Sequence, residues 1–306
     1  MIPARMLHEN ATAYHLALLR IMVFTLWMAD VVKDPITELS QVPFSDFHPV
    51  GVLRWLPMSF WSAVHTAHSL RLWWAMLLVF LALSALGTPG YRVISAITCI
   101  LLTFYQGMIF AFSHVTHAEL VPLYMTYLLA IFPAADAISL RRPRAPWAAK
   151  PIYKAALLAA TFVLLATYMF AGVHRLFAGG IDIFTNGTIL SMIADGSSTA
   201  DHLQQTYGLQ LLESPVTVLL LKVGFAGLSL VELLSPLCLG SKWFRRCWLA
   251  VMLPFHVLSW PLLQTLFVFN IILIWVLLID WDGIARRLGV GRLLGIVEAG
   301  ISPETN

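Results

Sequence analysis

Charged residues are scarce in this chain of 306 residues. They make up 11% of it, compared with about 25% in an ordinary soluble domain. The formal charge of +3 is small, and no stretch of lysine and arginine forms a basic face that could follow a phosphate backbone. We therefore expect no nucleic-acid partner.

Cysteine is also nearly absent. The three cysteines, Cys99, Cys238 and Cys247, are far apart and form no CxxC pair. This spacing indicates neither a disulfide framework nor a cysteine zinc site. We interpret all three as packing residues.

Hydrophobic residues take the place of the missing charges, at 59% of the chain. Apolar runs of about 20 residues, the length that a helix needs to cross the hydrocarbon core, recur along the whole sequence and leave no room for a soluble domain. We predict one domain over residues 1–306, an all-α integral membrane protein with about eight spans. The runs are Tyr14 to Val32, Ser69 to Gly87, Tyr91 to Ser113, Leu120 to Ala137, Ile152 to Arg175, Pro215 to Leu239, Phe244 to Trp260 and Leu262 to Trp281.

Turn signals and basic loops predict how these spans are threaded. Gly87-Thr88-Pro89-Gly90 is typical of a tight hairpin, and Ser259-Trp260-Pro261 is predicted to end the seventh span. With eight spans, three basic segments lie on one side. By the positive-inside rule that side is the cytoplasm, so a multi-pass protein of the cell membrane with both termini cytoplasmic is predicted. The basic residues are Arg141, Arg142, Arg144, Lys150 and Lys154, then Lys242, Arg245 and Arg246, then Arg286, Arg287 and Arg292.

In this topology five of the ten histidines fall at the outer ends of spans, and one more falls in the outer half of the seventh. They are His65, His68, His114, His117 and His174, with His256 in the seventh run. Ionisable residues at membrane depth are functional candidates by default, and histidine can transfer protons near neutral pH. The alternative is that these side chains are wetted by the headgroup zone. The i, i+3 spacing of two pairs is weak evidence for metal without an HExxH motif, so no metal site is predicted.

Two acidic residues, Asp30 and Glu232, lie deeper in apolar runs and need partners. Arg20 in the first run could pair with Glu232 if these spans are neighbours. Such a pair would join two helices structurally, and a role of Glu232 in a site is the alternative. Asp136 falls where the fourth run leaves the membrane, and we interpret it as a helix end.

Five segments follow one another in a familiar order and together resemble the HTTM family, the membrane domain shared with vitamin K-dependent γ-glutamyl carboxylase. The most telling of them, the segment around Gly172, is similar to the carboxylase's aromatic-x-x-Ala-Gly-Val-Lys-Lys-Leu. The resemblance covers nearly the whole chain and implies an HTTM-type helix bundle. The segments are His15-Leu16-Ala17-Leu18-Leu19-Arg20 with the Asp30 region, Ser113-His114-Val115-Thr116-His117, Phe132 to Ser139, Tyr168-Met169-Phe170-Ala171-Gly172-Val173-His174-Arg175-Leu176 with Gly187 after it, and Glu232-Leu233 through Phe255-His256 to Gln264 and Phe267.

The resemblance also predicts where the chemistry of this chain departs from that family. In the carboxylase the second lysine is the base that starts the oxygenation of reduced vitamin K, and Arg175 stands in its place here. Arginine stays protonated at any relevant pH, whereas a buried lysine can act as a base. The resemblance therefore implies the fold and argues against the same reaction. His174 takes the neighbouring position and could serve as a base, and His117 corresponds to a family histidine near the active site. The large lumenal domain of the carboxylase has no counterpart, so a propeptide-guided protein substrate is not expected.

The leading hypothesis is an outward-facing His/Arg pocket that binds a quinone-like lipid, such as menaquinone or vitamin K hydroquinone. Its candidate catalytic residues are His174, Arg175 and His117, and its candidate binding residues are His114, His256 and Glu232. The alternative is a non-catalytic accessory or partner of another membrane protein, in which the pocket is retained only structurally. A transporter ranks last, because no pair of matching interrupted helices occurs in the two halves.

Overall fold

The computed structural model describes residues 7–9, 11–112, 119–140, 149–179, 188–198, 207–263, 265 and 267–289. Within these ranges the chain is helical, and its β structure is one isolated bridge between Thr12 and Ala149. The long helices are α1 (Ala13–Lys33), α3 (Ala67–Leu86), α4 (Tyr91–Phe112), α6 (Pro151–Gly179), α10 (Pro215–Leu233) and α11 (Lys242–Leu263). The shorter ones are α2 (Met58–Val64), α5 (Leu120–Ile131), α8 (Thr188–Ser198), α9 (Tyr207–Leu212), α12 (Val268–Leu278) and α13 (Trp281–Arg287). The 3-10 helices are η1 (Ile36–Gln41), η2 (Phe44–Asp46), η3 (Gly51–Trp55) and η4 (Ser235–Cys238).

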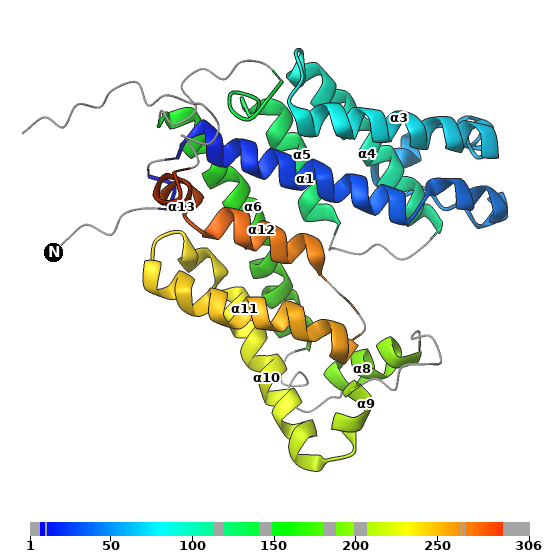
Figure 1. Cartoon of the computed structure of the whole chain (residues 1–306). Coiled ribbons are helices and arrows are strands. Elements are labelled where there is room, and N and C mark those ends of the chain that lie inside the picture. The colour runs from blue at the N-terminus through cyan, green and yellow to red at the C-terminus, as the bar shows by residue number, and fades with distance from the viewer. Residues whose placement is uncertain are drawn as a thin grey trace, which may run out of the picture.

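The helices form a bundle around α1 (Figure 1). Helices α3, α4 and α5 gather on one side of α1, and α12 lies on the other side with α11 beyond it. Helix α6 packs on α5, α1 and α12, runs obliquely to α1, and meets α10 near its C-terminal end. The core is apolar and aromatic. Trp27 of α1, for example, is fully buried against Phe269 of α12, with 5.1 Å between the ring centroids.

Within the described ranges six helices are long and apolar enough to cross a membrane, which confirms the prediction of an all-α chain with membrane-spanning helices. They are α1, α3, α4, α6, α10 and α11. Helices α5 and α12 coincide with the other two predicted spans and are apolar but shorter, at 12 and 11 residues. Many large apolar side chains on the long helices are exposed, such as Val79, Phe162 and Leu220. A bilayer is the environment that such surfaces require.

The predicted hairpin between α3 and α4 is present, and Gly87 ends α3 in the left-handed conformation with a φ of 63°. A Cβ at Gly87 would lie only 2.5 Å from Nη1 of Arg20, so glycine is required there for space as well as for conformation.

Two predicted helix ends are wrong. The fourth span was expected to reach Ala137, but α5 ends at Ile131, two residues before Pro133, which cannot continue the hydrogen-bond ladder. The seventh run was expected to end at Trp260, but α11 continues through Pro261 to Leu263, so the split between the last two runs falls between Leu263 and Val268. Apolar helices in membranes tolerate proline when neighbouring helices hold them in place.

The N-terminal end of α1 is tied to the C-terminal part of the chain. The Thr12 amide and hydroxyl both donate to the Asp282 carboxylate, at 3.1 and 2.5 Å. His15 Nε2 donates to the carbonyl of Val276 at 2.6 Å. Before the helix, His8 Nε2 is 2.9 Å from Thr161 Oγ1 of α6, and its ring packs edge-on against His15. These polar contacts join α1, α6, α12 and α13 at one end of the bundle.

His8 should make the stability of the protein fall in mild acid. Burial, followed by the nearby His15 and Arg245, lowers the pKa of His8 from 6.5 to about 2. As the pH falls, His8 therefore takes up a proton near pH 6.5 in the unfolded chain but only near pH 2 in the folded chain. Stability is full above that pH and is lost as the pH falls toward 2, by about 1.4 kcal/mol per pH unit. Unfolding in detergent at pH 7.5 and 5.5 measures this slope.

The matched comparison is His8→Gln, which keeps a hydrogen-bonding side chain but does not titrate. We expect a shallower slope than in the wild type. His68→Gln, at an exposed histidine of α3, should leave the slope unchanged. Equal slopes for His8→Gln and the wild type would contradict the prediction.

Candidate functional site

Helices α6 and α10 approach each other closely at Gly172. A Cβ at this position would lie 2.5 Å from the backbone nitrogen of Leu233 and 2.6 Å from the carbonyl oxygen of Ser229. The hydroxyl of Ser235 extends the contact by donating to the carbonyl of Leu165 at 2.7 Å. The two backbones therefore touch at Gly172, and residues one turn further along α6 face the end of α10.

This close approach pairs Arg175 with Glu232. Arg175 Nη1 donates to Glu232 Oε2. The carboxylate side chain is 3% exposed and the arginine side chain 28%. The guanidinium also lies over the ring of Phe225, 5.1 Å from its centroid. A carboxylate buried this deeply in an apolar bundle needs such a partner.

The expected pairing of Glu232 with Arg20 is wrong. Arg20 is completely buried beside the end of α3 and the segment after α5, where it donates to the carbonyls of Ala85, Ala134, Ala137 and Ile138. Three of these carbonyls are free to accept because the chain leaves helical structure after Ile131. Arg20 thus holds the segment after α5 in place, and Glu232 has a different cation.

His256 of α11 faces Tyr168 of α6. The Tyr168 hydroxyl is 2.5 Å from His256 Nε2, and both residues are buried. Aromatic rings enclose the pair: Trp248 lies edge-on to Tyr168 at 5.2 Å between centroids, and Phe267 lies edge-on to His256 at 5.3 Å. The Arg175 guanidinium is close enough to exert an electrostatic effect on the His256 ring.

Three buried polar atoms around this pair have no hydrogen-bond partner among the described residues. They are His256 Nδ1, Trp248 Nε1 and Asn270 Oδ1, and the Asn270 side chain lies beside Tyr168. Leaving such an atom unpaired costs about 1–3 kcal/mol, and the bilayer core offers no water to compensate. These are three of the six unpaired buried side-chain atoms among the described residues, and a ligand with polar groups of its own could satisfy them. We call Tyr168, Arg175, Glu232, Trp248, His256 and Asn270 the crossing site.

The structure brings together three of the six predicted site residues, Arg175, Glu232 and His256. His174 is next to Arg175 in sequence, but its side chain is exposed. His114 and His117 lie outside the described residues, as do Gly187 and Gln264 of the resembling segments. In the described ranges no group of three histidine, cysteine or acidic side chains could hold a metal ion.

Tyr168, Trp248 and Asn270 were not predicted as site residues. Tyr168 enters the sequence analysis only as the first residue of the resembling segment from Tyr168 to Leu176. Asn270 carried a usable signal, because it is an amide inside the apolar run of α12, and polar residues in such runs are expensive unless they have a purpose. No feature of the sequence marked Trp248 as a site residue, because tryptophan is common at membrane interfaces.

No family model, curated protein or solved structure matches this chain. The function must therefore be inferred from the crossing site itself.

Proposed function

We propose that the chain is an HTTM-type membrane protein that binds the head group of a quinone-like lipid at the crossing site. In this proposal α5 and α12 complete an eight-span arrangement in the cell membrane, with both termini on the cytoplasmic side. Menaquinone and vitamin K hydroquinone are the candidate ligands.

The observation that carries the proposal is the set of unpartnered buried atoms around the Tyr168–His256 pair. A quinone head group has two carbonyl oxygens that accept hydrogen bonds, and its reduced form has two hydroxyls that also donate. Trp248 Nε1 can donate, Asn270 Oδ1 can accept, and His256 Nδ1 can do either according to its tautomer. The rings of Trp248 and Phe267 supply apolar faces beside these polar atoms.

The arrangement supports binding and proton exchange more than base catalysis by Arg175. Arginine does not act as a base at any relevant pH. Arg175 donates to Glu232, so it stabilises the Glu232 carboxylate beside the site. His256 has one nitrogen at the Tyr168 hydroxyl and one free, and Nδ1 is therefore the atom at which this chain can exchange a proton with a bound ligand. His174 and His117 remain candidate bases from the family resemblance.

The test is the amount of quinone that the purified protein retains, measured by mass spectrometry after incubation with menaquinone in lipid nanodiscs. Tyr168→Phe removes one hydroxyl, and His256→Gln replaces the ring that carries the unpartnered nitrogen. Each should weaken retention about tenfold or more, because His256→Gln removes a nitrogen that would bond the ligand and Tyr168→Phe removes the hydroxyl that orients the His256 ring. His68→Gln, at an exposed histidine, is the matched control.

His174→Ala tests whether the candidate base His174 also contributes to quinone binding. This side chain is exposed, so we expect quinone retention to stay at the wild-type level. Quinone bound equally by Tyr168→Phe, His256→Gln and the wild type, or a wild type that takes up none, would refute the proposal.

The second candidate is a non-catalytic partner of another membrane protein. It is favoured by the Arg175–Glu232 ion pair, which joins α6 to α10 without any ligand. A wild type that takes up no quinone, yet is purified from its own membrane with one stoichiometric membrane protein, would support this candidate.

A further inference from the structure

A separate pocket lies where α3 meets α4, at the same end of the bundle as the start of α1. Its volume is about 550 Å³. It is lined by the Gly87–Gly90 turn, the first residues of α4, the segment from Pro133 to Asp136 and Lys150. In the topology proposed above, which this inference uses, this end of the protein faces the cytoplasm, where the lipid head groups lie.

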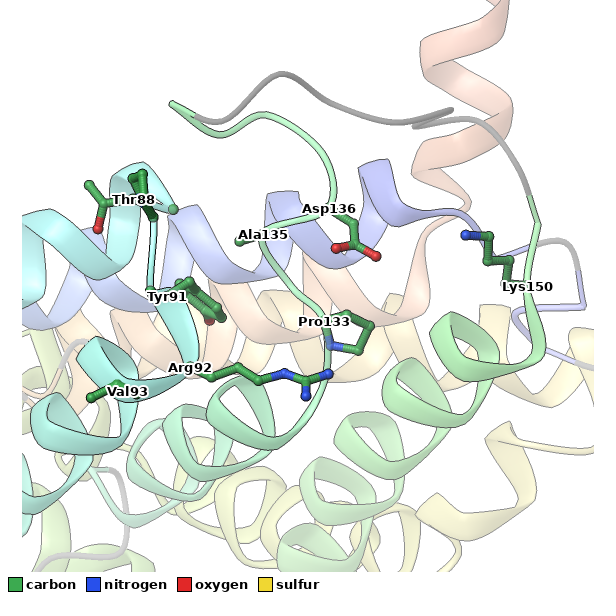
Figure 2. Close-up of a pocket in the computed structure, with 11 residues that line it drawn as sticks. Thr88, Tyr91, Arg92, Val93, Pro133, Ala135, Asp136 and Lys150 are labelled. Atoms are coloured by element: carbon green, nitrogen blue, oxygen red, sulfur yellow. The ribbon is translucent and has the colours of Figure 1, made fainter.

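Two cations reach this pocket from opposite sides (Figure 2). Arg92, from the first turn of α4, extends across it toward Pro133, and Lys150, just before α6, points back toward Asp136. Both residues are exposed, and neither forms an ion pair within the described part of the chain. Asp136 is the one carboxylate among the described residues of the lining, and it accepts a hydrogen bond from the Tyr153 hydroxyl at 2.8 Å.

A third positive charge lies directly behind the pocket wall. Nη1 of Arg20 would be 2.5 Å from a Cβ on Gly87, which lines the pocket, and its guanidinium lies 5.8 Å from the ring centroid of Tyr91. Arg20 is completely buried, and within the described ranges its partners are backbone carbonyls and not a carboxylate. Its charge is therefore not neutralised by a carboxylate, and it adds to the field in the pocket. Three cations against one carboxylate favour an anionic ligand.

We propose that this pocket binds a phosphate group, with Arg92 and Lys150 contacting its oxygens and Arg20 strengthening the field from behind. Phosphate chemistry suits both its charge and its position. Basic pockets between helices on the cytoplasmic side attract the head groups of anionic phospholipids, and a soluble phosphate could occupy the same place. The proposal is independent of the quinone ligand, because none of these residues belongs to the crossing site.

The test is binding of short-chain phosphatidylglycerol to the delipidated protein in detergent, followed by native mass spectrometry, with phosphatidylcholine as the neutral comparison. The double variant Arg92→Gln, Lys150→Gln should bind phosphatidylglycerol at least about tenfold more weakly, because it removes both contacting charges. The matched control is Lys33→Gln, Arg71→Gln, which removes one lysine and one arginine, both exposed, at the opposite end of the bundle. It should bind as the wild type does.

Asp136→Asn gives a result that misfolding could not imitate. It removes the only carboxylate among the described residues of the lining and keeps an oxygen for the Tyr153 hydroxyl, so binding should become about two- to threefold tighter.

Inorganic phosphate added as a competitor distinguishes the two sources. Displacement of phosphatidylglycerol at millimolar phosphate would identify a site for soluble phosphate, and no displacement would identify a lipid site. Equal affinities for the two lipids would overturn the proposal. So would equal binding by the two double variants.

Discussion

Replacing Arg175 by methionine should lower the free energy of unfolding in detergent by about 3–5 kcal/mol, the usual effect of leaving a buried charge without its partner. The methionine keeps much of the apolar length of the arginine side chain but cannot donate to Glu232, whose side chain is 3% exposed. Equilibrium unfolding in mixed micelles with increasing dodecyl sulfate measures the loss.

The double variant Arg175→Met, Glu232→Leu is the decisive control. It removes both charges at once, and an apolar replacement of a buried ion pair is often neutral or stabilising. We therefore expect it to recover most of the stability that Arg175→Met loses. A double variant as unstable as the single one would show that the pair is not the source of the effect.

Gly172→Ala should lower the free energy of unfolding by about 3 kcal/mol, toward the upper end of the range for overpacking. Its added methyl group would meet the backbone of α10 at Leu233 and Ser229, and backbone cannot rotate away as a side chain can. Helices α6 and α10 must separate, which also pulls Arg175 from Glu232. The same unfolding measurement tests the stability, and quinone retention should fall as well.

Gly227→Ala is the matched control for this prediction. Gly227 also lies in α10, and a Cβ there would find no atom of the described residues within 4 Å. Alanine is a better helix former than glycine by up to about 1 kcal/mol, so this variant should be neutral or slightly more stable. Equal effects of the two substitutions would rule out the close approach as the cause.

Part of the crossing site could be predicted from the sequence. Glu232 and His256 stand out because they are ionisable residues inside apolar runs, which are costly to keep. Arg175 stands out only through the resembling segment around Gly172. Tyr168 and Trp248 could not be selected in this way, because a chain with 8 tyrosines and 11 tryptophans holds many aromatic residues that only pack.

The sequence by itself determined that the protein is a helical membrane protein. The length and hydrophobicity of each run are local properties, and they decide whether a helix can lie in lipid whatever its neighbours are. The glycines and the proline of Gly87-Thr88-Pro89-Gly90 also predicted the turn, because a left-handed residue at a helix end depends on a few adjacent positions.

Only the tertiary structure decided which buried charges meet. Glu232 could have paired with Arg20 as well as with Arg175 on sequence grounds, since each is a cation in an apolar run. The helix crossing at Gly172 decides in favour of Arg175, and the non-helical carbonyls after Ile131 occupy Arg20 instead. Partners of buried charges depend on how distant helices cross, and that crossing is set by packing over the whole bundle rather than by the residues on either side of the charge.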